Sequence, residues 1–102
     1  METKKRKRLE ADGWRFGTYA DFLNLTDAEV ALVELRASLA AALKARRVKL
    51  GVTQVELAKR LQSSQSRVAK MEAGNPTVSF ELLMRALLVL GASRRELSAA
   101  IR

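Results

Sequence analysis

The stretch VTQVELAKRLQSSQSRVAKMEAG, from Val52 to Gly74, decides the fold of this chain. Thr53 is followed three residues later by Glu56, a capping-box pattern that starts a helix. The pair Ser63–Ser64 supplies a second start signal, because a serine oxygen can accept from free backbone N–H groups. Apolar residues recur at helical spacing after each start. The stretch therefore predicts two short helices joined by a tight turn.

Such a pair is a helix-turn-helix, whose second helix enters the major groove in proteins that bind DNA. Successive residues of a helix are about 100° apart, so Ser66 and Lys70 lie opposite Val68 and Met71. We expect base contacts from the exposed side, which comprises Gln65, Ser66, Arg67 and Lys70. We expect phosphate contacts from helix starts and nearby cations, namely Thr53, Gln54, Ser64, Arg46 and Lys49. Lys59 and Arg60 are either further phosphate contacts or ordinary solvated charges, and a purely structural helical hairpin is the alternative.

Composition limits the classes of function. The chain has 102 residues and a net charge of +8, with a pI of about 10.6, which favours a polyanionic partner. It has no Cys and no His, which excludes disulfides, thiolate catalysis and an ordinary zinc site. We expect no enzyme activity, no catalytic residue, no metal and no cofactor. No apolar run approaches the ~20 residues of a membrane span, so we expect a cytoplasmic protein.

Charge is distributed unevenly along the chain. Residues 9–35 carry six acidic side chains against one arginine, whereas residues 36–70 carry nine basic side chains against one glutamate. Segments of opposite sign suggest two different partners. The basic run Lys4–Arg8 stays open as a DNA-contacting arm, a solubility tail or a disordered end.

The remaining elements complete an all-α prediction of five helices preceded by an N-terminal arm. One helix starts at the capping box Thr26–Glu29 and runs to about Leu50, with a break possible near Ser38. Its apolar stripe consists of Leu32, Leu35, Leu39, Leu43 and Leu50. Two more helices follow the turn at residues 75–76, over 80–90 and from Ser93 to about residue 101. We therefore divide the chain into an arm, 1–25, and a helical domain, 26–102.

The arm holds four of the five aromatic residues of the chain: Trp14, Phe16, Tyr19 and Phe22. Large aromatic side chains dominate the energetics of protein interfaces, and an arm that orders on contact can wrap a partner. The alternative is that these side chains fold back on the protein's own core. Apolar residues near the C-terminus, including Leu88 and Ile101, similarly suit either a dimer contact or core packing.

The segments TQVELA (53–58) and SQSRVAKMEAG (64–74) resemble the xenobiotic-response-element (XRE, Cro/C1-type) repressor family. The resemblance covers about residues 38–91 and implies a five-helix lambda-repressor-like fold, a homodimer and a palindromic operator on double-stranded DNA. It also implies that Gln54 contacts a phosphate, that Gln65 contacts a base, and that Arg47 and Glu72 form a buried pair. Gln62 departs from the family pattern, which usually has glycine in the turn.

The order of parts, with GWRFGTYADFL (13–23) ahead of the helix-turn-helix, resembles HigA-type antitoxins. That resemblance implies an arm that binds a RelE/HigB-like ribonuclease toxin and a body that represses its own operon. The implied toxin-binding residues are Trp14, Phe16, Tyr19, Phe22 and Leu23. The alternatives are an XRE-family repressor without a toxin partner and, from another class, a helical protein–protein adaptor.

Overall fold

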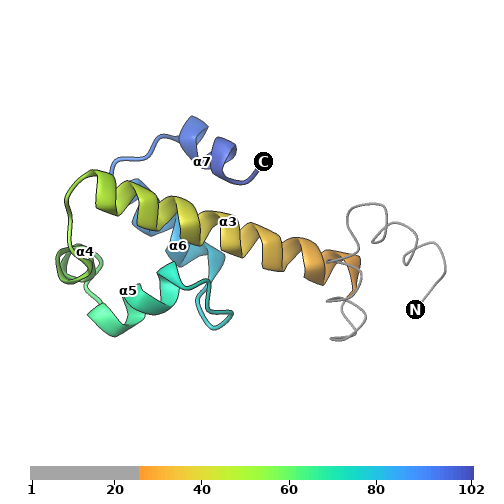
Figure 1. Cartoon of the computed structure of the whole chain (residues 1–102), viewed down its shortest axis with the longest axis horizontal. Coiled ribbons are helices and arrows are strands. Elements are labelled where there is room, and N and C mark those ends of the chain that lie inside the picture. The colour runs from red at the N-terminus through yellow and green to blue at the C-terminus, as the bar shows by residue number, and fades with distance from the viewer. Residues whose placement is uncertain (1–25) are drawn as a thin grey trace. The chain divides into compact units, whose positions relative to one another are not determined.

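The computed structural model describes residues 26–102, and the first helix in this range, α3, spans Asp27–Lys49 (Figure 1). The predicted capping box is present: the Glu29 N–H donates to the Thr26 hydroxyl at 3.1 Å, and the Thr26 N–H donates to the Glu29 carboxylate at 3.0 Å. Acidic residues in the first turn and basic residues in the last complement the helix dipole. The helix is continuous, without a break at Ser38.

Gly51 lies just beyond the end of α3. Its φ of 71° lies in the left-handed region, where a side chain is disfavoured. The N–H of Gly51 donates to the Val48 carbonyl at 3.0 Å, and the N–H of Val52 donates to the Arg47 carbonyl at 3.1 Å. These bonds satisfy carbonyls that the helix end leaves free, and they direct the chain into the next helix.

The two short helices of the deciding stretch are α4, Gln54–Arg60, and α5, Gln65–Glu72. Thr53 is the N-cap of α4, and its predicted capping box with Glu56 is formed in both directions. Ser64 is the N-cap of α5, and its hydroxyl accepts a hydrogen bond from the third residue of that helix at 3.1 Å. Local start signals therefore placed both helices correctly.

The turn between α4 and α5 depends on an unusual backbone conformation at Gln62. Its φ is 54°, and it is the one non-glycine residue in the described part of the chain with a positive φ. Its N–H donates to the Lys59 carbonyl at 3.1 Å, and the next N–H, of Ser63, donates to the Ala58 carbonyl at 2.8 Å. Gln62 thus adopts the conformation that glycine would adopt more easily.

Two further helices close the fold: α6, Phe80–Val89, and α7, Arg94–Ala100. Their N-caps are Ser79 and Ser93, and the second forms a capping box with Glu96. Residues 26–102 thus contain five helices and no strand, which confirms the all-α prediction.

The core joins four helices through their apolar sides. Its largest fully buried side chains are Leu43, Leu57, Val68, Met71 and Leu83. Burying one such side chain stabilises the fold by ~1.5–3 kcal/mol. The predicted stripe of α3 was wrong at two positions, because Leu32 and Leu50 are exposed. Leu32 precedes the first residue of the core cluster, Leu39, and Leu50 follows the end of α3.

Candidate nucleic-acid interface

Helix α5 has a buried side and an exposed side. Val68 and Met71 are fully buried in the core. The four side chains predicted to contact bases are all exposed, and they are Gln65, Ser66, Arg67 and Lys70. An α-helix fits the major groove, which is about 12 Å wide, so α5 has the form that base contact requires. The contacts themselves stay a prediction.

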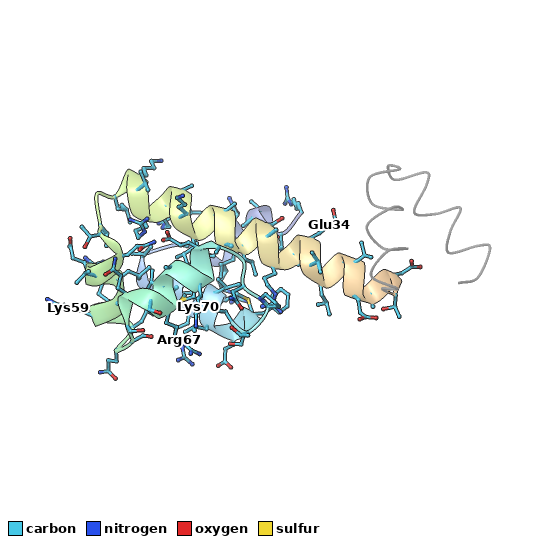
Figure 2. All side chains as sticks on the ribbon, turned by 60° about the horizontal axis from the view of Figure 1, so that its bottom comes forward. Glu34, Lys59, Arg67 and Lys70 are labelled. Carbon is cyan, nitrogen blue, oxygen red and sulfur yellow. The ribbon has the colours of Figure 1, made fainter. Side chains whose placement is uncertain are left out.

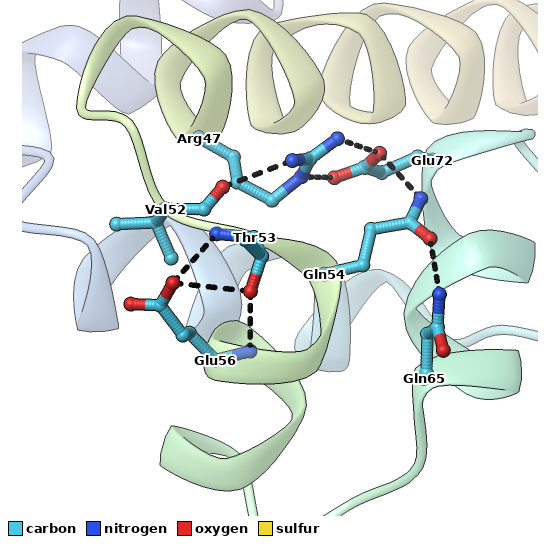
Figure 3. Close-up of polar contacts among 7 residues, drawn as sticks. All are labelled: Arg47, Val52, Thr53, Gln54, Glu56, Gln65 and Glu72. Carbon is cyan, nitrogen blue, oxygen red and sulfur yellow. Dashed lines mark hydrogen bonds and ion pairs between the residues drawn. The ribbon is translucent and has the colours of Figure 1, made fainter.

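A largely buried ion pair ties the end of α5 to α3. Arg47 donates from Nε and Nη2 to the two carboxylate oxygens of Glu72, the second bond measuring 2.9 Å (Figure 3). Its Nη1 also donates to the Val52 carbonyl at 2.9 Å. The side chains are only 12% and 3% exposed, respectively. This is the pair that the family resemblance implied, and the structure confirms it.

The ion pair extends to the tip of α5 through two glutamines. Gln54 Nε2 donates to Glu72 Oε1 at 3.1 Å, and Gln65 Nε2 donates to Gln54 Oε1 in a long hydrogen bond of 3.5 Å (Figure 3). A carboxylate accepts but does not donate, so the Gln54 amide must turn its oxygen toward Gln65. The Gln65 amide keeps its oxygen and one N–H free to meet a base edge.

Electrostatics keep the ion pair charged. Burial would raise the pKa of Glu72, but hydrogen bonds from Arg47 and Gln54, with the charges of Arg47 and Lys44, lower it overall. The hydrogen bond to Glu72 raises the pKa of Arg47, against the opposing effect of burial. Both partners are therefore ionised at neutral pH, and the chain of polar contacts starts from a fixed negative charge.

The two N-cap hydroxyls differ in their freedom to contact a phosphate. The Thr53 hydroxyl accepts from the Glu56 N–H at 3.1 Å and donates to the Glu56 carboxylate at 3.1 Å. The Ser64 hydroxyl accepts from the Arg67 N–H at 3.1 Å, which leaves its proton available to an acceptor. A phosphate contact from Thr53 would have to displace Glu56, whereas one from Ser64 displaces nothing.

Exposed cations accompany the exposed side of α5. Lys59 extends from α4, while Arg67 and Lys70 extend from α5 (Figure 2). Arg60, at the end of α4, and Lys49, at the end of α3, are exposed as well. A basic surface of this kind attracts the phosphates of a duplex and makes binding depend on salt.

Arg46 does not belong with these cations. Its Nε donates to the Leu90 carbonyl at 2.9 Å, and its Nη1 lies 2.8 Å from the Glu96 carboxylate. Leu90 ends α6 and Glu96 belongs to α7, which lies across α3 from α4 and α5 (Figure 1). Neighbouring residues of a helix point about 100° apart, so Arg47 faces α5 while Arg46 faces α7. A phosphate contact from Arg46 would therefore have to displace Glu96, and that contact stays a prediction.

Sequence reasoning missed a third arginine of α3. Arg36 donates from Nη1 to the Val78 carbonyl, and its guanidinium lies 4.5 Å from the centroid of the Phe80 ring. These contacts hold the loop between α5 and α6 against α3. The partners are 42 residues apart, so no local pattern could have indicated the contact.

Other predicted features lie beyond the described residues. The expected toxin-binding residues, Trp14, Phe16, Tyr19, Phe22 and Leu23, all fall in the part of the chain that the structure does not describe. Within residues 26–102, no group of three or more acidic side chains is arranged to hold a metal ion. No helix in that range is long and apolar enough to cross a membrane.

Comparison with known proteins agrees with this geometry. A family model described as helix-turn-helix matches residues 43–97, just over half of the chain. The match includes all of α4, α5 and α6. No curated protein and no solved structure gave a significant match. The chain therefore belongs to the helix-turn-helix family of the XRE type, a family of DNA-binding domains.

Proposed function

We propose that this protein is a sequence-specific DNA-binding regulator that reads its operator through α5. The observation that carries the proposal is the orientation of the exposed Gln65 amide by Gln54. The free oxygen and N–H of Gln65 match the N6 donor and N7 acceptor of adenine.

Selection from a randomised duplex library at moderate salt tests this proposal. We expect a defined preferred sequence, and we expect Gln65→Ala to relax the preference at one position by ~1–3 kcal/mol. Ser98→Ala is the control, because it removes an exposed polar side chain on α7, outside the helix-turn-helix. If no sequence is enriched, or if Q65A keeps the full preference, the protein–protein adaptor becomes the better account.

We also propose that the protein binds a palindromic operator as a homodimer. Exposed apolar side chains on α6 and after α7 support this, among them Met84, Leu88 and Ile101. Half-sites would then be separated by about one helical turn, or 10–10.5 base pairs. Leu88→Glu should shift the protein toward monomer in sedimentation measurements, whereas Val48→Glu, at an exposed apolar residue of α3, should not.

The finer proposal is an antitoxin that neutralises a RelE/HigB-like ribonuclease toxin through residues 1–25 and represses its own operon. It is supported by the acidic charge of residues 9–35 and by the aromatic residues placed ahead of the helix-turn-helix. A nuclease that acts on RNA is expected to be basic, and an acidic, aromatic segment suits such a partner. A small basic protein encoded next to this one would be the expected toxin.

Growth after co-expression with that neighbouring protein tests the antitoxin proposal. The full-length double variant Trp14→Ala/Phe22→Ala should lose neutralisation and keep operator binding. Lys5→Ala/Lys7→Ala is the control, because it changes the same segment without removing an aromatic side chain. Full neutralisation by the aromatic variant would favour an XRE-family repressor without a toxin partner.

A further inference from the structure

A polar groove lies between the turn of the helix-turn-helix and the start of α6. Its volume is about 290 Å³. It is lined by Gln62 and Ser63 of the turn and by Ser79, the N-cap of α6. Two arginines from different helices also line it, Arg67 of α5 and Arg85 of α6. The groove is therefore a polar site that brings two guanidinium groups to one cavity.

The charge in the groove is only partly neutralised by the protein itself. Arg85 lies 3.3 Å from the carboxylate of Glu81, but these side chains are 60% and 81% exposed. An exposed pair of this kind is weak, because water screens both charges. Glu81 is the one acidic residue lining the groove, against two arginines. An anion that binds both guanidinium groups can therefore displace it.

The chemistry of the groove suits a phosphate. Guanidinium groups match phosphate oxygens with paired N–H donors. The Ser79 hydroxyl accepts from the Leu82 N–H at 3.1 Å and keeps its own proton to donate. The first turn of α6 adds backbone N–H groups without partners inside the helix, with the positive end of its dipole.

The groove also lies on the side of α5 where DNA backbone is expected. Gln65 and Arg67 are two residues apart, so they point about 200° apart around the helix axis. Gln65 contacts Gln54 of α4 on one flank, whereas Arg67 lines the groove beside α6 on the other. A helix in the major groove has a sugar-phosphate strand on each flank.

We propose that Arg67 and Arg85 together grip a single backbone phosphate of the operator at this groove. The inference rests on the proposed DNA-binding function and deepens it. It changes the expected role of Arg67 from base reading to phosphate binding, and it adds Arg85, which the sequence did not indicate.

The first test replaces Arg85 with glutamine in the full-length protein. We expect Arg85→Gln to weaken binding about tenfold, equally on the selected duplex and on a scrambled duplex, with base preference unchanged. Because Arg67 still contacts that phosphate in R85Q, the slope of log K against log salt should fall by no more than about 0.9. Arg95→Gln is the matched control, since it removes the same charge from an exposed position on α7. If R85Q behaves like R95Q, the groove does not bind a phosphate.

The second test asks whether both arginines bind the same phosphate. If they do, the slope of log K against log salt should be lower in the double variant Arg67→Gln/Arg85→Gln than in the wild type by no more than one phosphate contact supplies, about 0.9. A loss of about 1.8 would mean two separate phosphates, and the single-phosphate grip would be wrong. If R67Q changes the preference at one base position and leaves the slope of log K against log salt unchanged, Arg67 contacts a base and not a phosphate.

The third test uses the competing carboxylate. Glu81→Gln should strengthen binding to both duplexes several-fold, and this gain should disappear in the R85Q background.

A titration with inorganic phosphate at matched ionic strength distinguishes a free phosphate ion from a phosphate of the DNA backbone. Suppose that the wild type binds inorganic phosphate saturably, and that R85Q abolishes this binding but leaves DNA affinity unchanged. The groove would then be a site for a free anion and not for the DNA backbone. If the wild-type protein binds no duplex, the proposed function itself fails, which is a different outcome from failure at Arg85 alone.

Discussion

Gln54 donates a hydrogen bond from Nε2 to Oε1 of Glu72 at 3.1 Å, although the two residues belong to different helices. The same carboxylate accepts two hydrogen bonds from Arg47 of α3. Glu72 therefore has two structural roles. It holds α5 against α3, and it sets the direction of the Gln54 amide. The attachment of α5 to α3 and the orientation of the Gln54 amide thus depend on one side chain.

The ion pair makes a prediction about stability. Glu72→Leu should lower the free energy of unfolding by ~3–5 kcal/mol, because it leaves the Arg47 guanidinium buried without its partner. The double variant Arg47→Leu/Glu72→Leu should recover most of that loss, since neither charge then remains. Urea denaturation of both variants and the wild type measures the difference. Equal losses in E72L and the double variant would contradict this reading of the pair.

The lowered pKa of Glu72 makes a prediction about acid. A carboxyl group whose pKa is lower in the folded state stabilises the fold fully above its unfolded value, near pH 4.3. That contribution is lost as pH falls through the folded value. The wild type should therefore lose stability below about pH 4.3 more steeply than Arg47→Leu/Glu72→Leu.

The acid experiment needs a control for a second carboxyl group. The pKa of Glu96 is also lowered, mainly by the backbone hydrogen bond from Ser93 and then by the side chain of Arg46. Both proteins should therefore be compared in a Glu96→Gln background, with urea denaturation repeated at each pH. Parallel curves in that background would show that Glu72 is not the source of the acid sensitivity.

The contact between Gln54 and Gln65 makes a prediction about specificity. Gln54→Ala should reduce discrimination at the base that Gln65 reads by about 1 kcal/mol, because the Gln65 amide is then free to reverse. The effect should vanish in a Gln65→Ala background, where no oriented amide remains. Fluorescence-anisotropy titrations on the selected duplex and on single-base variants measure both. An undiminished Q54A effect in that background would show that Gln54 acts independently.

The turn makes a prediction about strain. Gln62→Gly should raise the free energy of unfolding by up to ~1 kcal/mol, because glycine adopts a φ near 54° without a steric penalty. The larger backbone entropy of glycine in the unfolded chain offsets part of the gain. Gln62→Ala is the control, since it shortens the side chain and leaves the strain in place. A Q62G protein no more stable than Q62A would contradict this account.

Much of the fold could be predicted because its start signals are local. The capping boxes at Thr26, Thr53 and Ser93 each join residues three positions apart, so the sequence displays both partners together. The turn could be located but not described, since only the structure shows that Gln62 adopts the left-handed conformation. The Arg47–Glu72 pair was expected because of the family resemblance, not because of any local pattern.

What could not be predicted depends on contacts between distant residues. Arg46 is a basic residue near the helix-turn-helix in sequence, but its carboxylate partner lies 50 residues away on α7. Arg36 and Val78 are 42 residues apart, and no short pattern relates them. Arg85 belongs to the groove only because the start of α6 packs beside the turn. Helix periodicity gives the face of a residue, but tertiary packing decides which neighbour that face meets.

The attachment of α7 has a consequence for motion. None of its seven residues is fully buried, and the arginine at position 46 bonds both to the carbonyl that ends α6 and to Glu96. Its apolar contacts with the core come from Leu97 and Ala100, which are only partly buried, so its opening should require less energy than global unfolding. Its amide protons should therefore exchange with deuterium well before those of α3, while the helix-turn-helix stays closed.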